Sequence, residues 1–543
     1  MIDPTENRWW ERRSFLLAIL LVSALPLLWP QIPPLVDLPG HIGRYRVAVD
    51  LHSSADLQRY YDFRWMLIGN LGVDLLVLPL APVLGLEPAV KLIVICIPVL
   101  TVAGILAVAR QIHGRVPPST LFAVPFAYSY PFNYGFVNFA LSAALALLAF
   151  ALWLRWSRPS KLARRAMIFA PVSCALWVVH VFGWGLLGLL SFSAEVVRLR
   201  DEKMSWPGAI RGATVQVLPL TIPFALILLW RSRDVSGETK TFFLIPWKLL
   251  TVVSTLRDRW LFWDAIGVAV CLIVIGAGLF ERRLEFSRKI GFPAIALAVA
   301  FLALPYTLFG SAHADMRLAP YVIVAALIAI RFRERDTKAE ALVAILGLLF
   351  VLGRLAGNTA SFAIADRDDR AITRALDHVS RGAAVLTLTS GACDDPWALP
   401  RYWHLGALVI SRRHGFTNDH WEAPGAQLMS ARYAAAEPFH DIRSVLTFSP
   451  SCADRLNRNR PRGSEPVRNL QQSLDQFPRN AFEYVWLIKP PEGPYVVPSD
   501  LTEIWREEDS RLYRVTPPKR ANRTCRHNAN SLDLPILASC SSL

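Results

Sequence analysis

The sequence predicts a polytopic α-helical membrane protein with a C-terminal extracytoplasmic α/β domain. Of the 543 residues, 53% are hydrophobic and only 19% are charged, whereas soluble proteins carry about 25% charged residues. The mean hydropathy is +0.33, and the apolar residues form runs of the roughly 17–25 residues that a helix needs to cross a bilayer core of about 30 Å. After about residue 357 the chain turns polar, and its apolar runs become short and strand-like.

The apolar runs predict about eleven transmembrane helices. Their ranges are 14–30, 88–110, 118–131, 134–156, 165–180, 182–199, 209–230, 260–280, 289–309, 317–332 and 339–357. The run 67–84 is interrupted by Asn70, Asp74 and two prolines, so we interpret it as a re-entrant or interfacial helix. The short run 118–131 is the alternative for a partial span.

Basic residues orient these helices. The net charge of +15 does not indicate nucleic-acid binding, because many basic residues lie in short loops such as 155–165 and 281–289, where the positive-inside rule places them in the cytoplasm. No small-residue cleavage site follows 14–30, so this run is predicted to be a retained first helix and not a signal peptide. The N-terminus is then cytoplasmic, and 31–87 is the first outer loop of a transmembrane domain that spans 1–357.

The polar C-terminal part follows on the outer side. A connecting helix is predicted at 358–374, then a periplasmic α/β domain at 375–516, then a disordered tail at 517–543. Strands are predicted at 383–390, 407–411 and 483–489. Cys393 and Cys452 can form a disulfide if this domain faces an oxidising compartment. The sequence has no CxxC or Cys/His spacing typical of a metal site.

The first outer loop opens with "VDLPGH", in which Asp37, His41 and Arg44 stand at i, i+4 and i+7. If a helix begins here, this spacing puts the three side chains on one face. Asp37 can be an N-cap, with Pro39 in the first turn. A carboxylate at the outer boundary can also accept a proton from a hydroxyl nucleophile. His41 can orient that carboxylate, contact a phosphate or form only local hydrogen bonds.

A second cluster, "GSAHADMRLAP" at 310–320, brings His313, Asp315 and Arg317 to the same outer side. A tight loop often carries charges only for solubility, but an Arg beside a lipid-facing edge can hold a phosphate bidentately. His180 ends a span on this side and is a further candidate, because ionisable residues in membrane segments are often functional. A histidine at a helix end also commonly bonds a carbonyl group.

Two other polar stretches favour structural roles. The stretch 128–139 fits packing and anchoring at the membrane boundary; its polar residues are Asn133, Tyr134 and Asn138. The stretch before 260–280 is predicted to be a solvated charge run unless the fold brings it inward; it contains Arg257, Asp258, Arg259 and Asp264.

Taken together, these features resemble the GT-C superfamily of integral-membrane glycosyltransferases. The resemblance rests on a first helix followed by an outer loop that opens with an acid in "PPLVDLPGHIGR", and on "ADLQRYYDFRW" (55–65), which is similar to a juxtamembrane helix lying on the membrane. It also rests on "FNYGFVNFAL" before a strong span, on the "ADMRLAP" loop and on the outer C-terminal domain. It covers most of 1–357 and is closest to uncharacterised bacterial members.

The resemblance implies transfer of a sugar, with inversion, from a polyprenyl-phosphate donor to a lipid, glycan or protein acceptor at the outer face of the bacterial cytoplasmic membrane. It makes Asp37 the general base and Arg317 the ligand of the donor phosphate, with Arg44 as a weaker candidate. Asp315 and His313 would help shape the same cavity or hold Arg317 in place. His41 and His180 remain candidates for substrate binding from their positions in the sequence. No cofactor is implied, and dependence on a divalent metal stays open.

Two other functions fit parts of the sequence. A carrier or flippase of a lipid-linked or anionic solute would place ionisable residues at several depths within the spans, whereas most charges here lie at span ends. A non-catalytic scaffold for envelope assembly would use the outer domain to bind a partner. Activity separates this scaffold from an enzyme.

Overall fold

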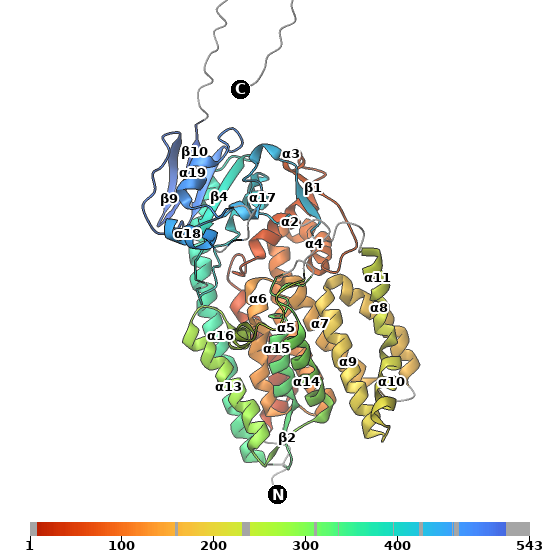
Figure 1. Cartoon of the computed structure of the whole chain (residues 1–543). Helices are drawn as coiled ribbons and strands as arrows, with labels where there is room; N and C mark the ends of the chain where they lie inside the picture. Colours follow the sequence, from red (N-terminus) through yellow and green to blue (C-terminus); the bar gives the residue numbers. More distant parts are fainter. Residues whose placement is uncertain are drawn as a thin grey trace, which may run out of the picture.

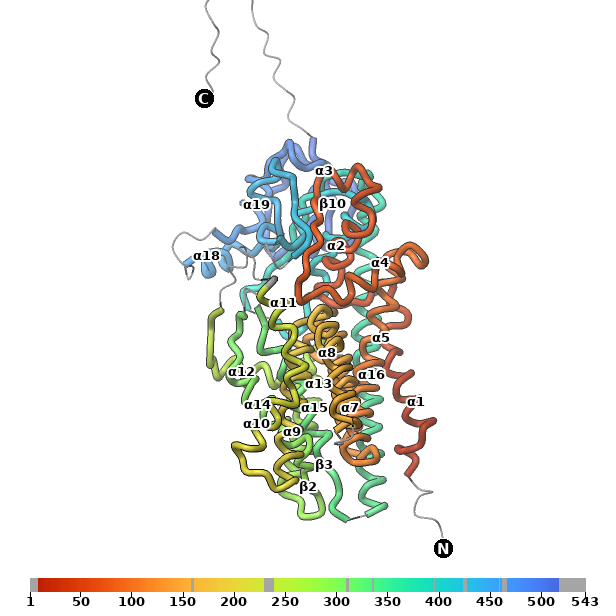
Figure 2. The backbone as a smooth tube through the Cα atoms, turned by 90° about the vertical axis from the view of Figure 1, so that its right-hand side faces the viewer, coloured from red at the N-terminus to blue at the C-terminus, as the bar shows by residue number. Residues whose placement is uncertain are grey.

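The computed structural model describes residues 8–157, 161–230, 239–308, 312–334, 336–394, 396–422, 427–458, 460 and 466–516. A bundle of helices carries a sheet-containing region at one end, and the N-terminus lies at the opposite end of the bundle (Figure 1 and Figure 2). The tail 517–543, predicted to be disordered, lies outside the described residues.

Six of the described helices are long and apolar enough to cross a membrane, which agrees with a multi-pass membrane protein. They are α5 (Leu86–His113), α7 (Val137–Arg155), α8 (Leu162–Val179), α9 (Val181–Asp201), α13 (Leu261–Phe280) and α16 (Thr337–Thr373) with its continuation η7 (Arg374–His378). Shorter helices are α1 (Arg13–Val22), α4 (Gly72–Leu84), α12 (Ile245–Val253), α14 (Arg288–Ala303) and α15 (Ala319–Ala329). By length and composition, fewer helices qualify than the eleven predicted.

The predicted spans 118–131 and 209–230 do not form single α-helices. The run 118–131 forms the 3-10 helix η3 (Pro118–Tyr128), whose residues are all buried. A 3-10 helix rises about 2.0 Å per residue instead of about 1.5 Å, so a short segment reaches further through the bundle. The run 209–230 divides into α10 (Trp206–Val217), η5 (Leu218–Thr221) and α11 (Pro223–Trp230), because its prolines lack the N–H that an α-helix needs.

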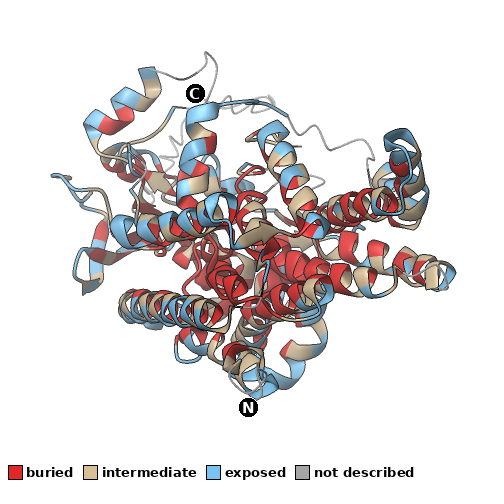
Figure 3. Ribbon diagram, turned by 90° about the horizontal axis from the view of Figure 1, so that it is seen from below, coloured by how far each residue is buried: buried red, intermediate tan, exposed pale blue. Residues whose placement is uncertain are grey.

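The outward faces of the bundle are apolar. Figure 3 shows buried residues gathered at the centre and exposed residues on the outer helices. The exposed side chains include Leu228, Ile273 and Phe280. Lipid tails would cover such a surface. At the end away from the sheet, β2 (Leu284–Phe286) pairs antiparallel with β3 (Ile330–Phe332), and the segment between these two strands contains α14 and α15.

The first outer loop does not lie on the membrane throughout. Its segment 55–65, predicted to be a juxtamembrane helix, forms α3 (Ala55–Tyr60) and then β1 (Tyr61–Phe63), which pairs with β6 (Met429–Ala431). The juxtamembrane prediction is therefore wrong for this segment. Its apolar side chains Leu57, Tyr60 and Tyr61 are buried against the C-terminal region and not available to lipid.

The C-terminal region is built on a mixed sheet. Its strands are β4 (Ala384–Ser390), β5 (Phe416–Thr417), β7 (Leu446–Thr447), β8 (Tyr484–Ile488), β9 (Leu501–Glu507) and β10 (Ser510–Val515). The strand β4 is parallel to β5, β7 and β8, whereas β10 is antiparallel to β8 and β9. The predicted strands at 383–390 and 483–489 are confirmed by β4 and β8.

The strand predicted at 407–411 is wrong, because this run forms η8 (Leu405–Ala407) and α17 (Leu408–Arg413). A short buried apolar run does not distinguish a strand from a helix by its periodicity. The helix α17 packs on α2 (Leu38–Asp50) of the first outer loop. Two further helices, α18 (Pro450–Arg458) and α19 (Leu470–Gln476), complete the region.

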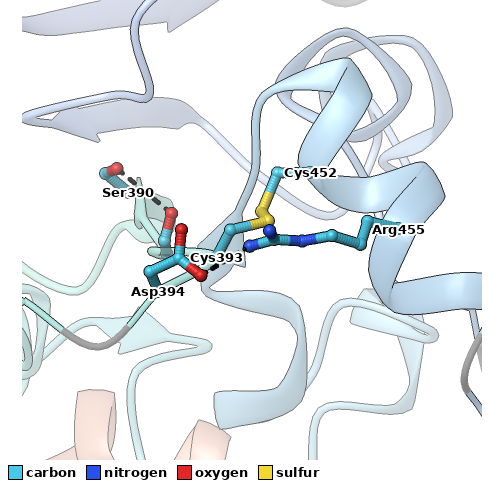
Figure 4. Close-up of a disulfide and its surroundings, with 6 residues drawn as sticks. Ser390, Cys393, Asp394, Cys452 and Arg455 are labelled. Atoms are coloured by element: carbon cyan, nitrogen blue, oxygen red, sulfur yellow. Dashed lines mark hydrogen bonds and ion pairs between the residues drawn. A yellow bond between two sulfur atoms is a disulfide. The ribbon is translucent and has the colours of Figure 1, made fainter.

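A disulfide joins Cys393 to Cys452, as the sequence allowed. Figure 4 shows that it ties the loop after β4 to α18, with Arg455 beside Asp394. The same loop then continues to Arg401, whose guanidinium bonds the carbonyl of Pro34 and the carboxylate of Asp258. The C-terminal region is thus tied to the end of the helix bundle that lies opposite the N-terminus (Figure 1).

Candidate active site

Asp37 is the N-cap residue of α2. Pro39 lies in the first turn of this helix, where its missing N–H removes no helical hydrogen bond. The Asp37 side chain makes no capping hydrogen bond with this helix. The carboxylate is instead directed elsewhere, with a side chain that is only 14% exposed. Capping therefore does not account for an acid at this position.

The backbone of Asp37 is held by the segment before α7. The N–H of Val36 donates to the carbonyl of Asn133, and the N–H of Asp37 donates to the carbonyl of Tyr134 at 2.9 Å. Gly135 follows with a φ of 105°. A Cβ at this glycine would lie 2.7 Å from the Asp37 nitrogen, so only glycine allows the two segments to approach this closely.

Arg317 is the cation beside Asp37 from the bundle. It lies in the turn before α15 and is 7% exposed. Its guanidinium carbon lies 4.6 Å from the ring centre of Phe136 and 5.2 Å from that of Phe182. Its charge acts on Asp37. Two residues predicted from separate clusters thus share one site.

The C-terminal region adds an imidazole to this site. His404 lies in the loop after β4, and its Nε2 is 3.7 Å from Oδ1 of Asp37. Its Nδ1 is 2.8 Å from Oδ1 of Asp419, whose side chain is 1% exposed. An imidazole therefore stands between two carboxylates.

The charges in this cluster set the protonation of Asp37. Burial raises the pKa of Asp37 to about 6, while the cations His404 and Arg317 oppose the rise and Asp419 adds to it. Burial lowers the pKa of His404, but Asp419 and Asp37 outweigh it, so the pKa of His404 lies above its ordinary value. Near neutral pH, Asp37 is therefore a carboxylate, and the two carboxylates beside His404 favour the protonated form of its imidazole.

His41 lies on α2 in the same cluster. Its ring centre is 5.2 Å from that of Trp421, which also packs at 4.7 Å on His404. Burial and then the charges of Arg44 and His404 hold the pKa of His41 well below its usual range. His41 is thus a neutral side chain that contributes shape and a hydrogen-bonding group.

His180 is the N-cap residue of α9. Its Nδ1 accepts a hydrogen bond from the N–H of Phe182 at 3.1 Å, and its carbonyl accepts one from Ser142. Its electrostatic neighbour is Arg317. The side chain therefore has a local structural role at the edge of the cluster.

Arg44 points away from Asp37. Its guanidinium lies 2.9 Å from Asp74, bonds Gln427 and is 3% exposed. Asp74 also accepts a hydrogen bond from Asn138 at 3.1 Å. A cation that is already paired and buried with a carboxylate is a poor phosphate ligand, so the geometry does not support this weaker candidate.

Asp315 and His313 are held by other groups. Asp315 pairs with Lys248 at 2.9 Å, and both side chains are buried. His313 lies 3.2 Å from the hydroxyl of Tyr306, and its ring packs near Tyr134. These contacts build the turn that presents Arg317.

Most of the charge run that was predicted to be solvated is buried, and only Arg259 is half-buried. Arg257, Asp258 and Asp264 are each at most 5% exposed. Asp264 bonds Arg354 of α16 and Trp397 of the C-terminal region. The fold brings these charges inward because each has a partner there, and the solvated interpretation is wrong.

His404, Asp419 and Trp421 were not singled out from the sequence. A usable signal is present, because "HLGA" follows β4 and "NDHW" follows β5. Parallel strands end at one edge of a sheet, and ligand sites gather there. Among the described residues, no group of three or more His, Cys, Asp or Glu side chains is arranged to hold a metal ion, and metal dependence stays open.

No family model and no curated protein matches the chain. Among solved structures, the chain is similar to ArnT from Cupriavidus metallidurans bound to undecaprenyl phosphate, with 13% identity and a TM-score of 0.45 over 92% of this chain and 97% of that chain. The apo state of ArnT has 12% identity and a TM-score of 0.44 over the same shares of the two chains.

A further similar structure is the Archaeoglobus fulgidus oligosaccharyltransferase tethered with an acceptor peptide. It has 12% identity and a TM-score of 0.41, over 88% of this chain and 69% of that chain. Similarity at this level does not assign an activity to the chain. A proposal about its activity is therefore argued from its own residues.

Proposed function

We propose that the protein is a membrane glycosyltransferase that moves a sugar from a polyprenyl-phosphate donor to a hydroxyl-bearing acceptor at the outer face of the cytoplasmic membrane. The observation that carries the proposal is a largely buried carboxylate, Asp37, on which the charge of a buried guanidinium, Arg317, acts at the end of an apolar helix bundle. One group is suited to accept a proton and the other to hold a phosphate.

The two side chains divide the reaction between them. Asp37 takes the proton as the acceptor O–H bond breaks, and the acceptor oxygen forms a bond to the anomeric carbon of the sugar. The bond from that carbon to the phosphate oxygen breaks, and its electron pair stays on the lipid phosphate. Arg317 stabilises this growing charge, which is worth most in a buried site. Attack opposite the leaving group inverts the anomeric carbon.

The depth of the site suits a lipid-anchored donor. Arg317 packs on Phe136 and Phe182, beside helices whose outward faces are apolar (Figure 3). A polyprenyl chain would remain in lipid while its phosphate reaches the guanidinium. A carrier for anions is less favoured, because buried cations of the bundle such as Arg165 and Arg354 are paired with carboxylates.

The test is transfer by purified protein in lipid nanodiscs, with a panel of polyprenyl-phosphate monosaccharides labelled in the sugar and a membrane extract as the source of acceptor. Release of label from the lipid phosphate is measured. We expect Asp37→Asn to reduce turnover by about 10²–10⁴-fold, the usual contribution of general base catalysis.

Asp50→Asn is the matched control. Asp50 lies on the same helix and pairs with Arg46 at the surface, so this variant should turn over like wild type. Undiminished turnover by Asp37→Asn would rule out Asp37 as the base. A wild type that releases no label from any donor would favour a non-catalytic scaffold.

A further inference from the structure

The imidazole of His404 lies beside Asp37 but has no role yet in the proposed reaction. It belongs to the C-terminal region, yet it reaches Asp37 of the first outer loop. Both side chains are nearly buried, at 12% and 14% exposed. A buried carboxylate needs compensating positive charge to stay ionised.

Arg317 by itself could compensate the charge of Asp37 only as long as no substrate phosphate is bound. If the proposed function holds, the donor phosphate binds Arg317 and brings its own negative charge close to Asp37. Like charges raise the proton affinity of a carboxylate. The base would then be protonated when it is needed, unless a second cation stays beside it.

His404 is built to be that cation. Its Nδ1 faces Asp419 at 2.8 Å, and Asp419 is 1% exposed, so the carboxylate is directed at the ring and not at water. The remaining titratable or charged groups that act on Asp37 and His404 are Arg317 from the turn before α15 and His41 from α2. His41 is neutral, so it does not replace His404.

The region around this pair holds it rigidly. Asn418 bonds both the N–H and the carbonyl of Thr387 in β4, at 2.8 and 3.0 Å, which places Asp419 directly beyond the sheet. The ring of Trp421 covers His404 and lies against Gly40, where a Cβ would be 2.4 Å from the indole. Such supporting contacts are typical of a site that must keep its geometry.

We infer that His404, kept charged by Asp419, is the positioning residue that holds the Asp37 carboxylate ionised while a phosphate occupies Arg317. The C-terminal region thereby completes the membrane site and is not only a separate binding module. This inference rests on the proposed function, since it assigns a partner to its base.

The first test is the pH profile of sugar release, measured as kcat/KM for the free enzyme and as kcat for the donor-bound enzyme. Because Asp37 must be ionised, wild-type activity should fall as the pH drops through about 6, the pKa of this carboxyl. His404→Gly removes the cation, and Asp419→Asn removes the carboxylate that keeps it charged. In both variants the midpoint of the pH profile should rise by about one pH unit or more. Activity of both variants should approach wild type at high pH, which a misfolded protein would not show.

Rescue and a matched control sharpen the test. His404 has a φ of 64°, a conformation that glycine adopts freely, so His404→Gly should fold. Imidazole, which can be protonated, should restore its activity near pH 6.5, whereas pyrazole, a similar ring that stays neutral, should not. His414 also has a positive φ, of 53°, but bonds Ser54 away from the site, so His414→Gly should keep the wild-type profile.

Equal midpoints for wild type and Asp419→Asn would overturn the inference, and so would equal rescue by pyrazole. If the wild type releases no sugar, the proposed function fails, and the charge of His404 is then read directly. Its ¹⁵N ring signals, assigned by their loss in His404→Gly, should show an imidazolium that titrates above pH 6.5 and at lower pH in Asp419→Asn. An unchanged titration would contradict the inference.

Discussion

At the scale of single residues, the partner of each charge decides its role at the outer boundary. Arg44 and Arg317 are both buried arginines close to the first outer loop. Arg44 is neutralised by Asp74 at 2.9 Å, whereas Arg317 faces the proposed base between two aromatic rings. The same kind of side chain therefore serves the fold in one place and acts on the proposed base in the other.

Arg44→Met is expected to lower the Tm strongly with little effect on turnover per folded molecule. It leaves Asp74 buried without its cation, which costs about 3–5 kcal/mol. Arg44→Met/Asp74→Asn removes the stranded charge and should recover much of the lost Tm. The measurements are thermal unfolding in detergent and sugar release. A loss of turnover at unchanged Tm would make Arg44 a substrate ligand.

At the scale of elements, the site depends on the crossing of two chain segments near α2 and α7. The turn of α6 (Tyr130–Tyr134) and Gly135 supplies the carbonyl that fixes the backbone of Asp37. The position of the base is thus set by a backbone contact and not by its own helix. A small displacement there should affect catalysis more than stability.

Gly135→Ala and Gly114→Ala form a matched pair for this contact. Both glycines have positive φ, of 105° and 73°, so each substitution costs roughly 1 kcal/mol or more in backbone strain. Only at Gly135 would the new Cβ press on Asp37, because nothing lies within 4 Å of the Cβ position at Gly114. Turnover should fall by about 10²-fold for Gly135→Ala only, as measured by sugar release. Equal losses in the two variants would mean that the contact with Asp37 is not critical.

At the scale of the whole molecule, the C-terminal region covers the end of the helix bundle that lies opposite the N-terminus (Figure 1). Strand β1 of the first outer loop pairs with β6, Arg412 of α17 bonds Glu87 of α5, and Arg401 reaches Asp258. The disulfide fixes the start of the loop that leads to Arg401 and His404 (Figure 4). Loosening this region should therefore disturb the membrane site.

The proposed orientation is tested through the disulfide. Cys452→Ser should lower the Tm, because the bridge joins residues 59 positions apart and such a loop is worth about 4 kcal/mol in the chain-entropy model. The freed Cys393 should react with a membrane-impermeant maleimide added outside intact spheroplasts. Cys174→Ser, at a free cysteine, should leave the Tm largely unchanged. Labelling only after permeabilisation would reverse the orientation.

Much of the fold follows from hydropathy. Runs such as 88–110, 260–280 and 339–357 correspond to α5, α13 and α16, because a helix that faces lipid must be apolar along its length whatever its neighbours are. The same argument fails for 118–131, where prolines and complete burial produce the 3-10 helix η3. It also fails for 55–65, whose apolar face packs on protein and not on lipid.

For the candidate site, residue type and topology by themselves indicated that Asp37 and Arg317 share the outer side, since alternating spans place their two loops there. The tertiary structure alone decided that Asp74 pairs with Arg44 and that His404 and Asp419 lie beside Asp37. The physical reason is the distance along the chain over which each effect acts. Hydropathy and helix spacing act between neighbours in the chain, whereas the ionisation of a buried acid depends on charges that folding brings from distant segments.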